Sequence, residues 1–376
     1  MKHLLLLLSL FLSNILSAQT GTQSNLTLEH NGINREYILY VPQAYDGQTE
    51  YPLLLNLHGY GSSMLEQIFY GEFRDIADTA NFIMAVPNGT LDPTGERYWN
   101  FFVPAGADDL GFLSDLIDEI STNYEINTNR VYSTGMSNGG FMSYYLACNL
   151  SDKITAIASV TGTMDASQLA GCTPTKPVPT MSIHGTDDAV VPYNGNITFA
   201  SVPNVVDHWV AQTNTNTSPV VTQLPDIDPT DNCTAEHYLY ENGTNGATVE
   251  HYKIVDGGHT WPGAIFDIGV TNHDFDASTV IWRFFSQFNS AELLSAKEEN
   301  QLDKIVNIYP NPSNGTINID INQSIDQLEI ISAQGQILRS LNNVDKSLTF
   351  TSVKPGIYFV KIHSKGKVTT QKAIVR

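Results

Sequence analysis

The sequence predicts an α/β protein whose mostly parallel sheet is flanked by helices, followed by a small antiparallel β-sandwich. Apolar runs alternate with helical patterns from residue 25 to 290, which is typical of helices covering a parallel sheet. Beyond residue 304, short β-rich runs are separated by Asn-Pro, Asn-Gly, Gln-Gly and Pro-Gly turns. Charge changes there too: residues 19–300 carry a net charge of −25 (nine Lys/Arg, 34 Asp/Glu), and residues 301–376 carry +4 (nine and five).

Composition excludes several classes of protein. The chain has 376 residues, of which 41% are hydrophobic, 10% aromatic and 15% charged, so it is too apolar for a disordered chain and too polar for a membrane bundle. At roughly 100 to 200 residues per domain, this length favours two domains. The net charge of −20 opposes binding to a phosphate backbone, so nucleic acid is not expected as a partner.

The first element is an expected signal peptide over residues 1–18. Lys2 and His3 give a basic start, residues 4–12 are almost continuously aliphatic, and Ser17 and Ala18 supply a small-residue cleavage site. A membrane anchor would need about 20 apolar residues, and Asn14 interrupts this run earlier. We therefore expect export and no membrane span in the mature chain.

The expected elements of the α/β region follow in order. Apolar runs predict strands at 26–29, 36–41, 52–57, 82–86, 130–133, 156–160, 180–184 and 249–255. Helical patterns predict helices at 65–80, 110–124, 139–148, 205–212 and 278–288. Asp108 and Asp109 stand where carboxylates can cap the second helix.

A nucleophile elbow is expected at Ser137. The strand 130–134 runs directly into Gly-Met-Ser-Asn-Gly-Gly (135–140), and an apolar helical stretch follows at once. The serine of such an elbow has a strained backbone, and a side chain at Gly135 or Gly139 would collide with the neighbouring strand and helix.

Ser137 needs a base and an acid, which in this architecture follow the serine in the order acid, then histidine. Strand 180–184 ends in a loop with Asp187 and Asp188, and strand 249–255 ends in a glycine-rich loop with His259. The oxyanion needs two backbone donors, which we assign to the N–H of Asn138 and the N–H of Tyr60.

Five ordered blocks resemble the polyhydroxybutyrate depolymerase and feruloyl esterase group of secreted α/β-hydrolases. They are 58–61 (HGYG), 108–112 (DDLGF), 135–140 (GMSNGG), 184–193 (HGTDDAVVPY) and 257–263 (GGHTWPG). The resemblance implies Ser137 as nucleophile, His259 as base and Asp188 rather than Asp187 as acid. It spans roughly residues 35–288, within an expected catalytic domain of 19–288. The sequence departs from the family at Tyr60, where members often have cysteine, and at Asp256, where they have a third glycine.

The C-terminal region resembles the sorting domain of the type IX (Por) secretion system over residues 305–376. The resemblance rests on the blocks 309–315 (YPNPSNG), 356–360 (GIYFV) and 372–376 (KAIVR). The resemblance implies that the type IX secretion machinery is a partner of this domain and exports the protein. A polar linker is expected at 289–304. A carbohydrate-binding sandwich is the alternative, but no exposed aromatic row supports it.

An exported protein is expected in an oxidising compartment, where disulfides form. The three cysteines are therefore counted as one disulfide pair and one remaining thiol. We expect a bridge between Cys148 and Cys172, with Cys233 free; three buried free thiols remain the alternative. His58 and His184 each end a buried strand and are expected to be structural. The ten histidines show no tight ligand spacing, so no metal or cofactor is expected.

These observations predict a secreted serine carboxylic-ester hydrolase that works through an acyl-enzyme on polymer-borne or aromatic esters. The candidates are feruloyl or acetyl esters of polysaccharide, polyhydroxyalkanoates and other polyesters, including aromatic ones of the poly(ethylene terephthalate) type. Tyr60, Trp99 and Trp261 are candidate cleft walls, although Trp99 fits core packing equally well. A secreted serine peptidase of the same fold and a catalytically inactive binding protein are the alternatives.

Overall fold

The computed structural model describes residues 20–102, 106–291, 293, 306–309, 313–321, 323–332, 337–351, 353–364 and 367–375. The expected signal peptide and most of the expected linker lie outside these residues. The chain divides into two compact units. The larger contains residues up to 208 with 220–238 and 250–287, and the smaller contains 209–219, 239–249 and 288–376. The four-part division at residues 18, 288 and 304 stays a prediction.

A ten-stranded sheet carries the candidate site, with the strand order β1-β2-β4-β3-β7-β8-β9-β12-β11-β10. The neighbours β3–β4, β3–β7, β7–β8 and β8–β9 pair in parallel, whereas β1–β2 and β2–β4 are antiparallel. The strands are β1 Thr22–His30, β2 Ile33–Val41, β3 Tyr51–Leu57, β4 Ile83–Pro87, β7 Ile126–Met136, β8 Ala156–Val160, β9 Thr180–Gly185, β10 Val220–Gln223, β11 Thr234–Tyr240 and β12 Val249–Val255. The predicted α/β fold with a mostly parallel sheet is confirmed.

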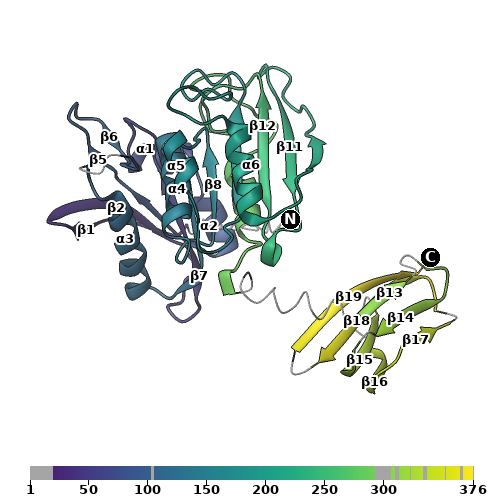
Figure 1. Ribbon diagram of the computed structural model, residues 1–376. Coiled ribbons are helices and arrows are strands. Elements are labelled where there is room, and N and C mark those ends of the chain that lie inside the picture. Colours follow the sequence, from purple (N-terminus) through teal and green to yellow (C-terminus); the bar gives the residue numbers. More distant parts are fainter. Residues whose placement is uncertain are drawn as a thin grey trace, which may run out of the picture. The chain divides into compact units, whose positions relative to one another are not determined.

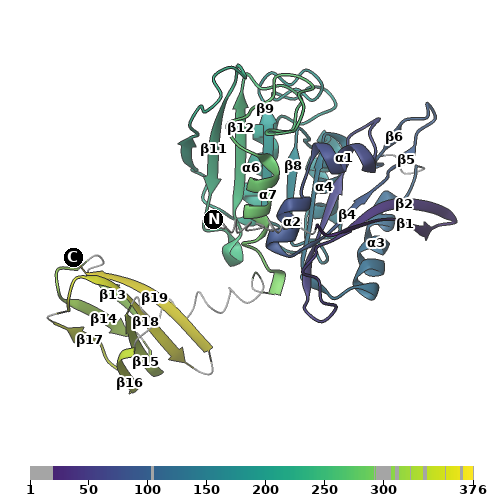
Figure 2. The same ribbon diagram turned by 180° about the vertical axis from the view of Figure 1, so that it is seen from behind.

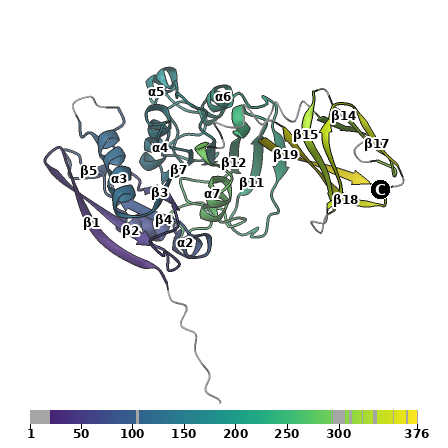
Figure 3. The ribbon, with the colours of Figure 1, turned by 90° about the horizontal axis from the view of Figure 1, so that it is seen from below.

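Helices cover both faces of this sheet, so its central strands are buried on both sides. Figures 1 and 3 show α3, α4 and α5 on one side, and Figures 2 and 3 show α2 and α7 on the other. Every residue of β3, β4, β8 and β9 is buried, which explains why these strands read as continuous apolar runs. The helices are α1 Met64–Tyr70, α2 Arg74–Ala80, α3 Asp109–Asn123, α4 Asn138–Asn149, α5 Ala166–Gly171, α6 Val202–Thr213 and α7 Ala277–Phe285, with a 3₁₀ turn at Thr244–Gly246. In the described part of the chain, no helix is long and apolar enough to cross a membrane.

The expected helix at 65–80 is in fact two short helices, α1 and α2. Gly71 caps the end of α1, and a Cβ atom at this position would lie 2.6 Å from the Gln67 amide and 3.2 Å from the Trp261 ring. The helical pattern of residues 65–80 continues across Gly71, so it does not reveal that the helix ends there. The close approach of Trp261, which is distant in the sequence, favours glycine at this position. At the start of α3, Asp108 accepts a hydrogen bond from the Gly111 N–H at 2.9 Å, as expected of a cap.

Some elements were missed or shortened by the sequence analysis. Strand β1 extends beyond 26–29 because the Asn31-Gly32 turn, with φ of 52° and 78°, closes a full hairpin with β2. The small hairpin of β5 (Thr90–Leu91) and β6 (Arg97–Tyr98) was not expected. Nor were α5, β10 and β11; β10 is exposed along its whole length and so lacks an alternating pattern.

The C-terminal region consists of two antiparallel sheets. They have the orders β13-β14-β17 and β16-β15-β18-β19. The strands are β13 Val306–Tyr309, β14 Ile317–Ile321, β15 Ile325–Ser332, β16 Ile337–Val344, β17 Leu348–Phe350, β18 Gly356–Ser364 and β19 Lys367–Val375. Their buried core is aliphatic throughout, with Ile319, Leu328, Val360 and Ile362 fully buried. The expected antiparallel β-structure after the main region is confirmed.

Candidate active site

Ser137 occupies a sharp turn between β7 and α4. Its backbone has φ 52° and ψ −117°, a strained combination for a residue with a side chain, of the kind that costs about 1 to 3 kcal/mol. The Ser137 N–H donates to Val160 O at 2.8 Å, which ties the turn to the neighbouring strand. Cβ atoms at Gly135 and Gly139 would lie 2.6 and 2.2 Å from Leu57 O, so the expected need for glycine at both positions is confirmed.

Asp188 and His259 lie in contact at the ends of β9 and β12. His259 Nδ1 is 2.7 Å from Asp188 Oδ2, and the imidazole must be the donor because a carboxylate can only accept. That places the proton of a neutral His259 on Nδ1 and leaves Nε2 as a proton acceptor. Asp187, by contrast, is exposed, and its backbone N–H donates to Gly257 O at 3.0 Å.

The Asp188 carboxylate is buried and fully engaged. Its Oδ1 accepts the N–H groups of Val190 and Val191 at 2.9 and 2.8 Å. His184 Nε2, itself buried, lies 3.2 Å from Oδ2 and 2.8 Å from Val191 O. Burial alone would raise the pKa of Asp188, but the hydrogen bonds and charges of His184 and His259 outweigh it and lower the pKa below its usual range. His184 thus acts on the acid loop, in keeping with its expected structural role.

The loops of the acid and the histidine pack against each other without room for side chains. A Cβ atom on Gly185 would lie 2.2 Å from Gly257 O, and the Asp256 N–H donates to Thr186 Oγ1 at 2.8 Å. Asp256 has φ 61°, in the left-handed region that glycine favours and aspartate tolerates. The departure from the family's third glycine is therefore accommodated by the backbone.

Ser137 and His259 line one cavity of about 320 Å³. The remaining wall is mainly apolar, with Met136, Tyr70, Phe266 and Ile268, and also includes Gly59, Tyr60, Ser62, Glu66 and Gln67. Phe266 and Ile268 are more than half exposed, so their apolar surface is open to a ligand in this cavity. Tyr70, Phe266 and Ile268 were not expected at the site. For the last two, a signal was present in the sequence, because Ala264, Ile265, Phe266 and Ile268 follow the histidine loop closely.

The expected oxyanion donors flank Ser137. Asn138 is the first residue of α4, where free N–H groups and the helix dipole favour a negative charge. On the other side, a Cβ atom on Gly59 would lie 3.5 Å from Ser137 Cβ, so the loop carrying Tyr60 lies directly against the serine. Tyr60 lines the cavity, is 56% exposed, and donates its hydroxyl to Asp92 Oδ2 at 2.6 Å.

The chain is similar to known esterases and, in its C-terminal region, to a secretion domain. Residues 107–215 match the model of the phospholipase/carboxylesterase family, and residues 307–376 match that of the secretion system C-terminal sorting domain. Feruloyl esterase B of Piromyces equi is 30% identical over 60% of this chain and 42% of its own length. A probable feruloyl esterase C of Aspergillus terreus is 30% identical over 49% of this chain and 67% of its own. The chain belongs to the feruloyl esterase family of α/β-hydrolases. A bifunctional acetylxylan esterase/xylanase of Neocallimastix patriciarum is 28% identical over 61% of this chain.

This feruloyl esterase homologue spans 42% and 31% of the Piromyces and Neocallimastix relatives, so each has further parts outside the match. Its residues 307–376 match the secretion system C-terminal sorting domain, in agreement with the resemblance seen in the sequence.

Two of the three aromatic residues expected at the cleft do not line it in this feruloyl esterase homologue. Trp99 is 0% exposed, and its indole N–H donates to His58 O at 3.0 Å. Trp261 is 1% exposed and donates to Ser278 Oγ at 3.2 Å. Both indoles are enclosed with their polar atoms satisfied, so neither lines this cavity; for Trp99 the structure matches the core-packing alternative.

The cysteines are arranged as expected. Cys148, on α4, and Cys172 form a disulfide with a Cα–Cα distance of 5.0 Å, and Cys233 is free and buried. Burial raises the pKa of the Cys233 thiol to about 12, so this sulfur is not a nucleophile at neutral pH. In the part of the chain that the structure describes, no group of three or more His, Cys, Asp or Glu side chains could hold a metal ion.

Proposed function

We propose that the protein is an exported carboxylic ester hydrolase with Ser137 as nucleophile, His259 as general base and Asp188 as its orienting acid. The observation that carries the proposal is the 2.7 Å contact between His259 Nδ1 and Asp188 Oδ2, on a histidine that shares a cavity with the strained Ser137. Membership of the feruloyl esterase family supports the reaction class.

In the proposed reaction, Ser137 Oγ attacks the ester carbonyl carbon while His259 Nε2 takes its proton. The carbonyl oxygen becomes an oxyanion, which accepts hydrogen bonds from the N–H groups of Tyr60 and Asn138. The intermediate expels the alcohol, which leaves with the proton from His259. Water, activated by the same histidine, then hydrolyses the acyl-enzyme.

We propose esters with an apolar or aromatic acyl group as substrates, carried by a polymer outside the cell. Feruloyl and acetyl esters of polysaccharide come first, because the relatives are named for them, and polyesters second. The apolar wall formed by Tyr70, Phe266 and Ile268 suits a planar acyl group, since an aromatic contact adds about 0.5 to 1.5 kcal/mol beyond the area that it buries.

An ester panel on the purified protein tests this proposal. It consists of methyl ferulate, acetyl xylan, short p-nitrophenyl esters, polyhydroxybutyrate, an aromatic polyester, a long-chain triglyceride and a peptide substrate. We expect turnover of the feruloyl, acetyl and short esters. Turnover of the peptide alone would favour the peptidase alternative, and turnover of nothing would favour the binding protein.

Export is proposed to begin at the signal peptide 1–18 and to end with the type IX machinery. Mass spectrometry of the protein in the culture medium tests this: we expect its N-terminus near Gln19. An intact Met1 on exported protein would contradict the signal peptide.

A further inference from the structure

A group of three residues, two of them buried and Asn138 partly buried, connects the two loops that carry the proposed oxyanion donors. We call it the brace: the side chain of Asn138, the whole of Trp99, and His58. Trp99 lies between α4, which provides the Asn138 N–H, and the loop 58–63, which provides the Tyr60 N–H. In the proposed reaction, these two loops contribute only their N–H groups, and the brace itself does not touch the reacting atoms.

The first half of the brace is a two-point contact. Asn138 Oδ1 accepts the Trp99 N–H at 2.6 Å, and Asn138 Nδ2 donates to Trp99 O at 3.2 Å. One carboxamide therefore holds both backbone groups of a single residue, which fixes the position and the orientation of that residue. The residue after the nucleophile thus has two separate features, a backbone donor and a side-chain clamp.

The second half of the brace runs from Trp99 to the Tyr60 loop. The Trp99 indole N–H donates to His58 O at 3.0 Å. His58 Nε2 accepts the Gly89 N–H at 2.9 Å, so the proton of the neutral ring is on Nδ1, which lies 2.7 Å from Gly59 O. Burial lowers the pKa of His58 to about 4, which keeps the ring neutral and this tautomer in place near pH 7.

The Gly59 carbonyl matters because it belongs to the same planar peptide unit as the Tyr60 N–H. The two groups point in opposite directions in that plane. A hydrogen bond that fixes Gly59 O on the His58 side therefore fixes the Tyr60 N–H on the opposite side.

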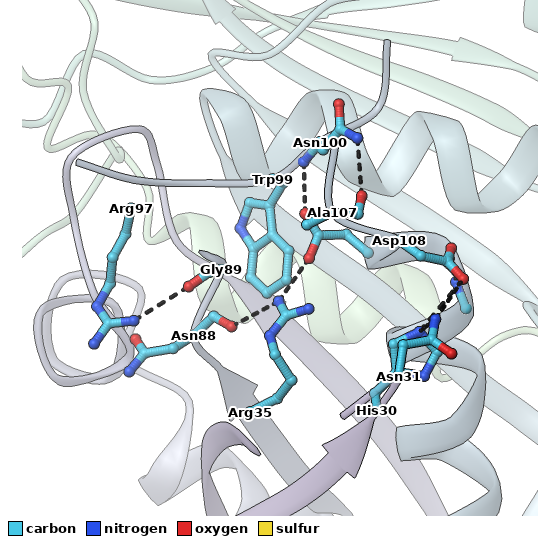
Figure 4. Close-up of polar contacts among 12 residues, drawn as sticks. His30, Asn31, Arg35, Asn88, Gly89, Arg97, Trp99, Asn100, Ala107 and Asp108 are labelled. Atoms are coloured by element: carbon cyan, nitrogen blue, oxygen red, sulfur yellow. Dashed lines mark hydrogen bonds and ion pairs between the residues drawn. The ribbon is translucent and has the colours of Figure 1, made fainter. Parts of the chain in front are cut away.

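A buried ion pair anchors the segment that contains Trp99 (Figure 4). The Asn100 N–H donates to Asp109 Oδ2 at 2.7 Å, and Arg35 binds Asp109 Oδ1 at 2.6 Å. Arg35 also donates to Asn88 O at 3.1 Å, one residue before Gly89. Both charged side chains are at most 4% exposed, and a buried pair of this kind is strongly destabilised if one partner is removed.

We propose that Asn138 and Trp99 are positioning residues, which hold the N–H groups of Asn138 and Tyr60 at the one separation that lets both bind the oxyanion. This inference rests on the proposed ester hydrolysis. Trp99, which the sequence suggested as a substrate contact, would then support the oxyanion donors without touching the substrate.

The test uses Asn138→Ala and Trp99→Phe, measured on p-nitrophenyl acetate. Both keep the backbone N–H donors and remove a link of the brace. We expect kcat to fall at least tenfold in each, with KM within twofold, because removing an oxyanion donor costs about 10² to 10³ in kcat and a displaced donor loses part of this. Trp282→Phe is the matched control, since Trp282 is a buried indole that stacks on Phe82, and should retain kcat within twofold.

Phenylboronic acid separates positioning from a general loss of structure. Ser137 Oγ adds to boron, its proton passes to His259, and an oxygen of the resulting tetrahedral boronate occupies the oxyanion site. Its inhibition constant should rise by about the same factor as kcat falls, with no matching change in the affinity for the product acid.

The double variant measures whether the two links act together. If they form one brace, Asn138→Ala with Trp99→Phe lowers kcat by less than the product of the single effects. Full kcat in Asn138→Ala would overturn the inference, as would equal weakening of boronate and product acid. Should Trp99→Phe fail to fold, the Asn138→Ala results decide by themselves. A wild-type protein with no turnover would instead refute the proposed function, so the two failures are distinguishable.

Discussion

The larger unit and the C-terminal β-region bury different kinds of side chain. The larger unit has charged and polar groups in its interior, among them Arg35, Asp109, His58 and Asp188, each at most 4% exposed. In the described part of residues 306–375, the buried hydrophobic cluster is aliphatic, and the buried polar side chains are two uncharged serines, Ser313 and Ser364. Buried polar groups cost free energy unless they are bonded, so they are kept where a fixed geometry is required.

This contrast indicates where function resides. An aliphatic core specifies volume and tolerates exchange of one apolar side chain for another, whereas a hydrogen-bonded interior specifies directions. In the larger unit, the bonds of His58, Asp188 and Asn138 all converge on loops around Ser137. The β-region contains no comparable network among its described residues, which suits a domain that is recognised by its surface.

The largest effect in the larger unit is expected from removing the nucleophile. Ser137→Ala should lower kcat roughly 10⁴-fold or more, because it removes the hydroxyl that His259 is proposed to activate. Alanine keeps the strained backbone, so thermal unfolding should not change. Retention of more than about a tenth of wild-type kcat would place the reaction elsewhere in the chain.

The next largest effect is expected from the buried acid. Asp188→Asn should lower kcat by about 10³- to 10⁴-fold, because an amide can present its N–H to His259 and so favour the wrong tautomer. Asp187→Asn is the matched control, one residue away and exposed, and should stay within twofold. If Asp187→Asn silenced the enzyme and Asp188→Asn were mild, the assignment of the acid would be wrong.

The sequence predicted the parts of the site that depend on local order. The elbow lies in one continuous stretch from β7 to α4, and the acid and histidine each follow a buried strand. These features need only the strand pattern and the chain order. The choice between Asp187 and Asp188 came from the family resemblance, and the structure now adds a direct contact between Asp188 and His259.

The errors concern contacts between distant segments. In the sequence, Trp99 and Trp261 cannot be told apart from aromatic residues that line a cleft. In the structure both are buried, and their indole N–H groups donate to His58 O and Ser278 Oγ. Phe266 has the apolar character of a core residue and is half exposed beside the cavity. Neither burial nor exposure of a single aromatic residue follows from its neighbours in the chain.

A smaller effect is expected on the free energy of unfolding at acid pH, and it should arise from the buried His58. The folded-state pKa of His58 is about 4, below the roughly 6.5 of the unfolded chain, so between these values the unfolded state binds more protons. Its contribution to stability is full above pH 6.5 and is lost as the pH falls towards 4. We expect a loss of about 2 kcal/mol from His58 between pH 7 and pH 5.

Urea unfolding followed by tryptophan fluorescence measures this, because all four tryptophans precede residue 288. The variant His58→Gln, which does not titrate in this range, should show a correspondingly smaller change between the two pH values. An identical pH dependence in both proteins would contradict the assignment.

The disulfide also stabilises the larger unit. Its cysteines are 24 residues apart, and closing a loop of this length contributes about 3 kcal/mol in the chain-entropy model, less any strain. The double variant Cys148→Ser/Cys172→Ser should lower the free energy of unfolding by an amount of that order or less. Cys233→Ser serves as the comparison, and the non-reduced digest should contain a peptide linking 148 to 172. A peptide linking Cys233 to either residue would refute the pairing.

The smallest effect is expected from removing the C-terminal β-region, and it tests the contrast from the other side. If that aliphatic region serves export alone, a chain ending at residue 298, within the predicted linker, retains kcat/KM on p-nitrophenyl acetate within twofold. A soluble substrate is essential, because a polymer surface could be bound by the β-region independently of the reaction. A tenfold fall corresponds to about 1.4 kcal/mol of lost transition-state stabilisation, which would require the β-region to support the site itself. The same truncation should abolish export, and an exported truncated protein would mean that the sorting signal lies before residue 298.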